Sequence, residues 1–239
     1  SLRRWYVEQY RLFNDDLGRT CNAYFRDALI KNYIYKGPVL EWYMRVKCRI
    51  DGYYDLWDRL TPRNGTITDI GCGYGQMSFM LALLSPDRRV LGIDYDSEKI
   101  ELANHSFLTK RCNVKFMCGD MREVDIPMSD AILFNDSLHY VDAEAQRAIL
   151  RRAVDSLNEG GMIIVRDGDA SQTVKHEKIK RTELWSTQIV KFNKTTSDLT
   201  FVSEHWMREF AQQNGLDIVI RRCDKDSSET LYILKRLGK

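Results

Sequence analysis

The sequence predicts an α/β fold: a doubly wound, mostly parallel seven-stranded sheet with a helical cap. A β-branched run at residues 66–70 leads into three closely spaced glycines and then into an apolar helical pattern. Beyond it, short apolar runs alternate with amphipathic helical patterns, which is typical of parallel strands covered on both faces. Ligands of such folds bind at the carboxyl ends of the strands. We therefore expect the functional site at that edge of the sheet.

Residues 1–60 predict a helical, aromatic-rich cap ahead of a core of residues 61–239. Apolar side chains recur there at three- and four-residue intervals, the spacing of one helix face. Helices are expected at Tyr6–Leu17, Tyr24–Ile30 and Val39–Leu60, the last after a break at Gly37-Pro38. Aromatic stripes at helical spacing are usually buried surface. We therefore expect most of these rings to pack, and the alternative is that some line an apolar substrate pocket.

Strands and helices alternate through the first part of the core. The strands are expected at Thr66–Ile70, Val90–Asp94, Val114–Met117, Ala131–Asn135 and Met162–Arg166. The helices between them are expected at Gln76–Leu84, Ser97–Thr109 and Ala143–Leu157, with a turn at Glu159–Gly161 before the fifth strand. This alternation is the pattern of a doubly wound fold.

The last part of the chain departs from the alternation. The sequence of residues 172–198 predicts a charged, helical insertion in the cap. Two interpretations of this insertion are open: a lid, and a solvated surface helix. Ser203 is then expected to cap a helix that stops at Gly215. The runs Leu216–Arg221 and Thr230–Lys235, separated by a polar turn, predict a hairpin.

Composition narrows the class of protein. With 239 residues, 44% of them apolar, the chain can bury a sizeable core. A net charge of +2 gives no bulk electrostatic case for binding nucleic acid or an anionic membrane. No apolar run is long enough to span a bilayer, so we expect no direct membrane insertion.

The six cysteines lack a C-x-x-C pair, which argues against a disulfide frame or structural zinc and favours a reducing, cytoplasmic compartment. We expect no metal site. The chain begins at Ser1 rather than Met, so we also expect that it is part of a larger fused polypeptide. The alternative stays open that it is the cytoplasmic domain of a membrane-associated protein.

The glycine spacing distinguishes two cofactor classes. A dinucleotide fingerprint needs G-x-G-x-x-G, whereas this chain has glycines at 71, 73 and 75, and Gln76 stands where the third glycine would fall. The pattern Asp69-x-Gly71-x-Gly73-x-Gly75, with an acidic residue ending the second strand, resembles that of the class I S-adenosylmethionine-dependent methyltransferases. The resemblance extends over roughly residues 60–170, a usual size for such a core.

The resemblance implies a role for each matching residue. Asp69 and the backbone of residues 71–75, Cys72 included, would hold the amino-acid end of S-adenosylmethionine. Asp94, followed by Tyr95, would accept hydrogen bonds from the ribose hydroxyls. Asp120 would meet the adenine amine and Met121 would lie on the ring. The cofactor-binding set is therefore Asp69, Gly71, Cys72, Gly73, Gly75, Asp94, Tyr95, Asp120, Met121 and Asn135, the last at the start of a family motif that extends to Tyr140.

His139 is the expected catalytic residue. Methyl transfer to an oxygen, nitrogen or activated carbon can need a base, and imidazole titrates near neutrality. The alternative is a structural histidine that bonds a neighbouring carbonyl. Asp136, Tyr140, Asp167 and Asp169 are further candidates at strand ends. His105, His176 and His205 sit in helical patterns without ligand spacing, so we expect them to face solvent or to cap helices.

A narrower resemblance concerns three segments: 35–43, Leu138-His139-Tyr140 and Arg166-Asp167-Gly168-Asp169. They look like methyltransferases of bacterial aryl-polyene and flexirubin pigment pathways, some of which are fused to acyltransferase and transporter domains. The resemblance implies methyl transfer to a small-molecule or lipid-linked, aromatic acceptor. The alternatives are a nicotinamide-dependent oxidoreductase, which shares the fold, and a non-catalytic scaffold that binds S-adenosylmethionine.

Overall fold

The computed structural model describes residues 27–50, 54–168, 199–223 and 229–236. The chain divides into two compact units, residues 1–121 and 122–239. Seven strands follow the order β3-β2-β1-β4-β5-β7-β6 in one sheet. The predicted fold class, a mostly parallel seven-stranded sheet with helices, is confirmed. The boundary expected after residue 60 stays a prediction.

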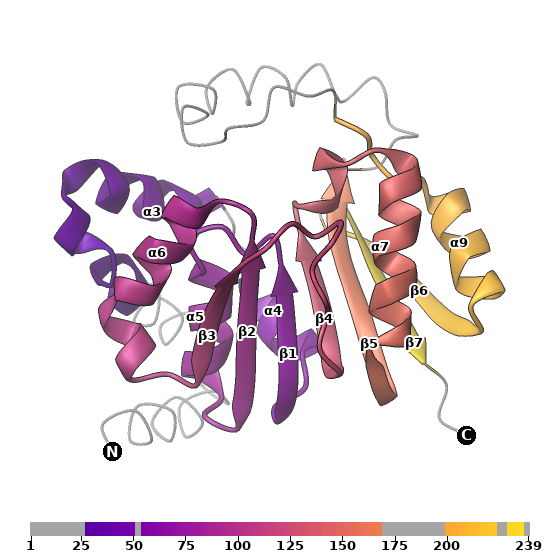
Figure 1. Ribbon diagram of the computed structural model, residues 1–239, viewed down its shortest axis with the longest axis horizontal. Coiled ribbons are helices and arrows are strands. Elements are labelled where there is room, and N and C mark those ends of the chain that lie inside the picture. Colours follow the sequence, from indigo (N-terminus) through magenta and orange to yellow (C-terminus); the bar gives the residue numbers. More distant parts are fainter. Residues whose placement is uncertain (1–26, 51–53, 169–198, 224–228, 237–239) are drawn as a thin grey trace. The chain divides into compact units, whose positions relative to one another are not determined.

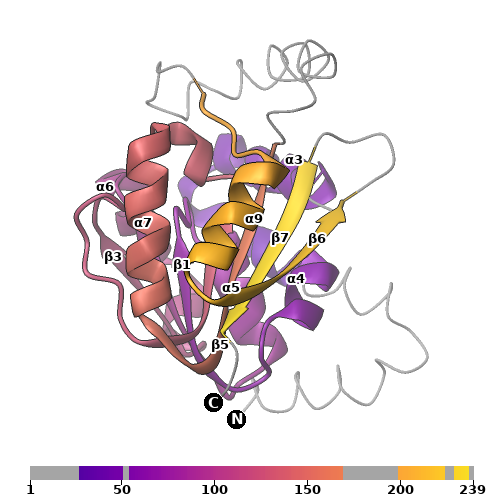
Figure 2. The same ribbon diagram turned by 90° about the vertical axis from the view of Figure 1, so that its right-hand side faces the viewer.

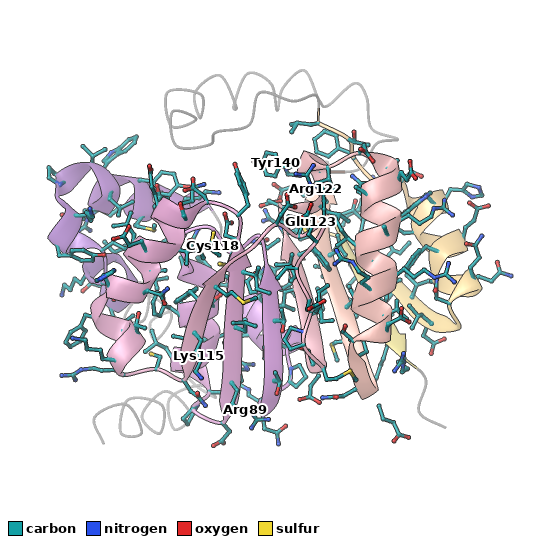
Figure 3. All side chains as sticks on the ribbon, in the orientation of Figure 1. Arg89, Lys115, Cys118, Arg122, Glu123 and Tyr140 are labelled. Carbon is teal, nitrogen blue, oxygen red and sulfur yellow. The ribbon has the colours of Figure 1, made fainter. Side chains whose placement is uncertain are left out.

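The first unit is built on three parallel strands that lie side by side in Figure 1. Its elements are η1 (Ile34–Lys36), α3 (Pro38–Ile50), α4 (Tyr54–Leu60), β1 (Gly65–Ile70), α5 (Gln76–Leu84), β2 (Arg88–Asp94), α6 (Ser97–His105), η2 (Phe107–Lys110) and β3 (Val114–Cys118). Ile70 pairs with Ile93, and Asp94 pairs with Cys118, so the three strands end at the same edge. In Figure 3, Cys118 marks that carboxyl edge, and Arg89 and Lys115 mark the opposite one.

Helix α5 is apolar all round because it is buried all round. Each residue from Met77 to Leu84 is buried, which is typical of a helix enclosed on every side. Helix α6 is shorter than predicted. It ends at His105 because Ser106 turns extended and its hydroxyl donates to the Ala103 carbonyl at 2.7 Å, and the 3-10 helix η2 follows.

The described part of residues 1–60 is largely helical and packs by its aromatic side chains. Tyr33, Tyr43, Tyr54 and Trp57 are buried, as the packing interpretation predicts. Tyr35 and Trp42, in contrast, are about half exposed, at 49% and 56%. The range of the long helix expected at Val39–Leu60 contains α3 and α4, and residues 51–53 between them lie outside the described residues. The helix expected at Tyr6–Leu17 also lies outside them.

A fully buried arginine fixes α4 to the strands. Arg88, at the start of β2, is 0% exposed. Its guanidinium donates to the Asp58 carboxylate at 2.6 Å and to the carbonyl oxygens of Asp58, Pro62, Thr61 and Leu81. Arg63 adds a second ion pair to Asp58 at 3.0 Å. One side chain thus satisfies the last carbonyls of α4 and the turn into β1.

In its described residues, the second unit has four strands and two long helices. Its elements are β4 (Ser129–Asn135), η3 (Leu138–Tyr140), α7 (Ala143–Asp155), β5 (Leu157–Gly168), α9 (Glu204–Gln213), β6 (Leu216–Arg222) and β7 (Glu229–Arg236). Strand β5 is parallel to β4, and the hairpin strand β7 is antiparallel to both β5 and β6. Figure 2 shows α9 lying against this hairpin. Ser203 caps α9 by accepting from Trp206 N–H at 3.2 Å, and Gly215 follows the helix with a φ of 63°, both as predicted.

Strand β5 begins earlier than predicted. Leu157 pairs with Ser129 and Met162 with Ala131, so the residues between Leu157 and Met162 bulge from the ladder. The expected turn at Glu159–Gly161 falls in this bulge, where Gly160 has a φ of 69°. The insertion expected at residues 172–198 lies outside the described residues.

We predict that Arg88→Met destabilises the protein by roughly 3 to 5 kcal/mol, because it leaves a buried carboxylate with one partner fewer and removes the guanidinium donor from the carbonyls of Asp58, Thr61 and Pro62. Urea unfolding at pH 7 measures the change. Arg89→Met is the matched control, since the neighbouring Arg89 side chain is exposed and bonds only Thr66 at 3.1 Å. It should change stability by about 0.5 kcal/mol or less. Equal losses in the two variants would contradict the role of Arg88.

Candidate functional site

A glycine loop, residues 71–75, connects β1 to α5 in the first unit. Its three glycines have positive φ values, 76° at Gly71, 57° at Gly73 and 79° at Gly75, a region that side chains disfavour. The N–H groups of Gly71 and Cys72 donate to the Ile93 carbonyl at 2.8 and 3.0 Å, and Gly75 N–H donates to Cys72 O at 2.9 Å. The loop is therefore a closed turn fastened to the end of β2.

The ring of Phe116, on β3, packs directly against this loop. A Cβ atom on Gly75 would collide with Phe116, and one on Gly92 would lie 2.6 Å from the same ring. A Cβ on Gly73, in contrast, would meet no heavy atom within 4 Å. Gly75 and Gly92 are thus required by packing, whereas the backbone at Gly73 faces open space that a ligand can approach.

Asp94 closes the loop from the end of β2. One carboxylate oxygen accepts from Gly73 N–H at 2.8 Å and the other accepts from Asp96 N–H at 2.9 Å. Asp96 in turn caps α6 by accepting from the N–H groups of Glu98 and Lys99. Each carboxylate oxygen has two lone pairs, so Asp94 can accept further bonds from a ligand while it holds the loop.

Asp69 lies buried on β1, 1% exposed, before the loop. Ser78 donates its hydroxyl to this carboxylate at 2.6 Å. Burial raises the pKa of Asp69 to about 6, and the Ser78 bond lowers it only in part. Burial, reinforced by Asp69 and Asp94, also raises the pKa of the Cys72 thiol. Cys72 therefore stays a thiol, which fits its expected role as backbone and small side chain.

The start of α5 presents polar groups without side-chain partners. Gly75 stands at the N-cap and supplies no side-chain cap. The first N–H groups of a helix have no intrahelical acceptor and carry its positive dipole end. Beside them, Gln76 Oε1 is buried and has no hydrogen-bond partner among the residues that the structure describes. The residue that replaces the third glycine of a dinucleotide fingerprint is thus an unsatisfied acceptor.

The other residues expected around the cofactor follow the second and third strands of the same unit. Tyr95 comes directly after Asp94 and is 48% exposed, and its carbonyl accepts from the Cys118 thiol at 3.5 Å. Asp120 and Met121, both partly exposed, follow β3. Gly119 N–H donates to Asp94 O at 2.9 Å, which ties this turn to the end of β2. The structure thus gathers the predicted residues of the first unit at the carboxyl ends of three strands.

In the second unit, His139 pairs with Asp167. The imidazole Nδ1 lies 2.5 Å from Asp167 Oδ1, and His139 N–H donates to Asp167 Oδ2 at 3.1 Å. Gly168 N–H donates to Oδ1 at 2.8 Å. Burial raises the pKa of Asp167, and His139 offsets part of that shift. An imidazole whose Nδ1 carries the proton toward a carboxylate has Nε2 as its basic nitrogen, so the pair has the arrangement of a general base and its orienting acid.

Neighbouring residues keep the imidazole in place. Thr200 N–H donates to the His139 carbonyl at 3.0 Å, and the Phe201 ring lies 5.3 Å from the imidazole. A Cβ on Gly168 would lie 2.7 Å from the Phe201 ring. Gln146, buried on α7, donates to the carbonyls of Leu138, Val141 and Thr200. Sequence reasoning missed Gln146 and Phe201, because no local spacing links them to His139.

The end of β4 is held by a second buried arginine. Arg166, 3% exposed, donates to Asn135 Oδ1 at 3.1 Å, Asp136 Oδ2 at 2.6 Å and Glu229 Oε2 at 2.5 Å. Asp136 has a φ of 51°, and a non-glycine residue persists there only when its surroundings fix it. Asn135 and Asp136 thus have structural partners, and their expected contacts with ligands stay predictions.

The remaining candidates lie elsewhere. His105 and His205 are exposed, as expected, and His105 Nδ1 lies 2.8 Å from the Glu101 carbonyl. His176 and Asp169 lie outside the described residues. None of the five cysteines that the structure describes forms a disulfide. Within the described ranges, no cluster of three potential metal ligands occurs, and no helix is long and apolar enough to cross a membrane.

Part of the chain is similar to known proteins. Residues 67–161 match the family model of a methyltransferase domain. A carboxy-S-adenosyl-L-methionine synthase from Campylobacter curvus is 24% identical over 148 residues, 59% of this chain and 63% of that protein. The chain thus spans less than two thirds of that relative's length.

Two solved structures share the fold. An O-methyltransferase family protein from Burkholderia thailandensis has a TM-score of 0.62 and 16% identity, covering 91% of this chain and 60% of that one. An O-methyltransferase family 2 protein from Planctomyces limnophilus, in complex with apigenin, has a TM-score of 0.60 and 19% identity, covering 81% of this chain and 59% of that one.

We predict that Asp69→Asn stabilises the protein increasingly as pH rises from about 4 to 6. Burial raises the pKa of Asp69 from 3.8 to about 6, so between these pH values Asp69 is protonated in the folded wild type and ionised in the unfolded chain. The free energy of unfolding of the wild type therefore falls as pH rises from about 4 to 6. The variant lacks this loss and keeps an oxygen for Ser78. Its advantage should reach roughly 3 kcal/mol above pH 6.5.

Urea unfolding of both proteins at several pH values measures this difference, and the exposed substitution Asp217→Asn controls for general acid sensitivity. A difference between wild type and Asp69→Asn that is constant from pH 4 to pH 7 would contradict the assignment.

Proposed function

We propose that this chain is a class I S-adenosylmethionine-dependent methyltransferase that transfers the methyl group to a small-molecule or lipid-linked aromatic acceptor; its residues 67–161 match the family model of a methyltransferase domain. S-adenosylmethionine, when bound, supplies that methyl group on a sulfonium. One observation supports this proposal most strongly. The Asp94 carboxylate accepts from Gly73 N–H in the glycine loop and can still accept further hydrogen bonds from a ligand.

The residues of the first unit fit this cofactor. An α-ammonium group needs acceptors, and both the buried Asp69 carboxylate and the unsatisfied Gln76 Oε1 stand beside the loop in sequence. A carboxylate needs donors, and the start of α5 has no side-chain cap. Asp94 would accept from the ribose hydroxyls, while Tyr95, Asp120 and Met121 would surround the adenine.

In the proposed reaction His139 removes a proton from the acceptor. Asp167 at 2.5 Å holds the proton on Nδ1 and stabilises the imidazolium that forms when Nε2 takes up the acceptor's proton. A positioned base of this kind contributes about 10²- to 10⁴-fold to the rate. The rest of the acceleration would come from holding the acceptor in line and dry.

Three observations favour an aromatic acceptor. The narrower resemblance to pigment-pathway methyltransferases favours an aryl acceptor, and the neighbour from Planctomyces limnophilus was solved with apigenin, an aromatic phenol. The exposed rings of Tyr35 and Trp42 add aromatic surface in the first unit.

A second candidate is chemistry on the cofactor itself. Several curated relatives, 24 to 30% identical, are carboxy-S-adenosyl-L-methionine synthases, and the match to one of them covers 63% of its length. Mass spectrometry distinguishes the two. A methyltransferase yields S-adenosylhomocysteine and a methylated acceptor, whereas a synthase yields a carboxylated form of S-adenosylmethionine.

We predict that Asp94→Ala weakens binding of S-adenosylhomocysteine by about 1.5 to 3 kcal/mol, roughly a ten- to hundredfold rise in Kd. The variant removes a charged acceptor from the ribose and releases Gly73 N–H. Isothermal titration calorimetry measures the Kd. Asp96→Ala is the control, because Asp96 is also buried and accepts from two backbone N–H groups, which belong to the start of α6 and not to the glycine loop. Unchanged affinity in Asp94→Ala would exclude Asp94 from the ribose site.

We predict that His139→Ala and Asp167→Asn keep the wild-type Kd for S-adenosylhomocysteine but lower kcat, His139→Ala by about 10²- to 10⁴-fold. Asp167→Asn should act in the same direction, because an amide no longer holds the proton on Nδ1. Turnover is followed as S-adenosylhomocysteine formation with a panel of phenolic acceptors. Wild-type kcat in His139→Ala would leave His139 as a structural residue.

A further inference from the structure

Tyr33 connects the start of the chain to the glycine loop. Its side chain is 0% exposed, and its hydroxyl donates to the carbonyl oxygen of Tyr74, inside the loop, at 2.5 Å. Burial raises the pKa of Tyr33 well above its usual value, so the phenol remains a donor. The two residues are 41 positions apart in the chain.

This bond fixes one peptide plane of the loop. The Tyr74 carbonyl is held by Tyr33, and the N–H group of the same peptide, on Gly75, donates to Cys72 O at 2.9 Å. Because a peptide unit is planar, restraint at both its oxygen and its nitrogen sets its orientation. The orientation matters because Gly73 N–H precedes this peptide and the first free N–H groups of α5 follow it.

Further contacts converge on Tyr74 from two other elements. The Tyr43 ring, on α3, meets the Tyr74 ring edge-on with centroids 5.6 Å apart. Lys99 Nζ, on α6, lies 5.5 Å from the centroid of the Tyr74 ring. Tyr33 itself packs edge-on against Phe79 of α5, at 6.3 Å. The loop is thus held at Tyr74 by residues of the segment 27–50, and at its glycines by β2 and β3.

We propose that Tyr33 is a positioning residue for the cofactor: through the Tyr74 carbonyl it holds the glycine loop in the conformation that binds the amino-acid end of S-adenosylmethionine. The inference rests on the proposed function, because it assigns that end of the cofactor to the loop. The proposal gives residues 27–50 a second role: besides packing on the core, they support the glycine loop that binds the cofactor.

The test compares Tyr33→Phe with Tyr35→Phe. Both variants remove a hydroxyl that donates to a main-chain carbonyl, but the Tyr35 hydroxyl bonds Leu102 O on α6 at 2.8 Å, outside the loop. Calorimetry measures the Kd for S-adenosylhomocysteine, which has the amino-acid end, and for 5′-methylthioadenosine, which lacks it. Tyr33→Phe should raise the first Kd about tenfold, the loss of one buried hydrogen bond, and leave the second within about twofold.

Tyr35→Phe should leave both affinities unchanged. In the ligand-free protein, Tyr33→Phe should also speed hydrogen exchange of Gly75 N–H, which bonds within the loop. Equal weakening of both ligands, or no weakening of either, would overturn the role of Tyr33. Failure of wild type to bind either ligand would instead overturn the proposed function, and with it this inference.

Discussion

The packing of the Phe116 ring against the glycine loop is the constraint on which the cofactor site depends. The ring occupies the space where Cβ atoms of Gly75 and Gly92 would lie, so β3, the end of β2 and the loop can pack together only with glycine at both positions. This close approach brings Gly73 N–H within 2.8 Å of the Asp94 carboxylate. One carboxylate can then hold the loop and still accept bonds from a ligand.

The two units use buried charge in related ways. Arg88 in the first unit and Arg166 in the second are almost fully buried. Arg88 binds the Asp58 carboxylate and backbone carbonyls before β1, and Arg166 binds the carboxylates of Asp136 and Glu229 at strand ends. Such clusters are costly to desolvate, so their benefit lies in fixing the loops that carry functional residues. Arg88 fixes the entry to β1, and Arg166 fixes the strained residue Asp136 shortly before His139.

Local sequence predicted the strands, the glycine loop and the N-cap of α9, because each depends on residues close together in the chain. Gly71, Gly73 and Gly75 show their backbone requirement directly, and Ser203 caps its helix as expected. The pairing of His139 with Asp167 was not predicted. Both residues were candidates at strand ends, but 28 positions separate them, and no local pattern links them. Tyr33, Phe116 and Gln146 could not be assigned, because their roles arise from contacts across elements. The exact ends of α6 and β5 were missed because a serine back-bond and a bulge decide them.

We propose that the glycine loop holds the amino-acid end of S-adenosylmethionine. This proposal is tested most directly by titrating protein labelled with ¹⁵N-glycine with S-adenosylhomocysteine and following the glycine amide resonances. We expect large shifts at Gly71, Gly73 and Gly75, and none at Gly160 or Gly215, which lie in the β5 bulge and after α9. Saturable binding that leaves the three loop amides unmoved, or no binding at all, would contradict it.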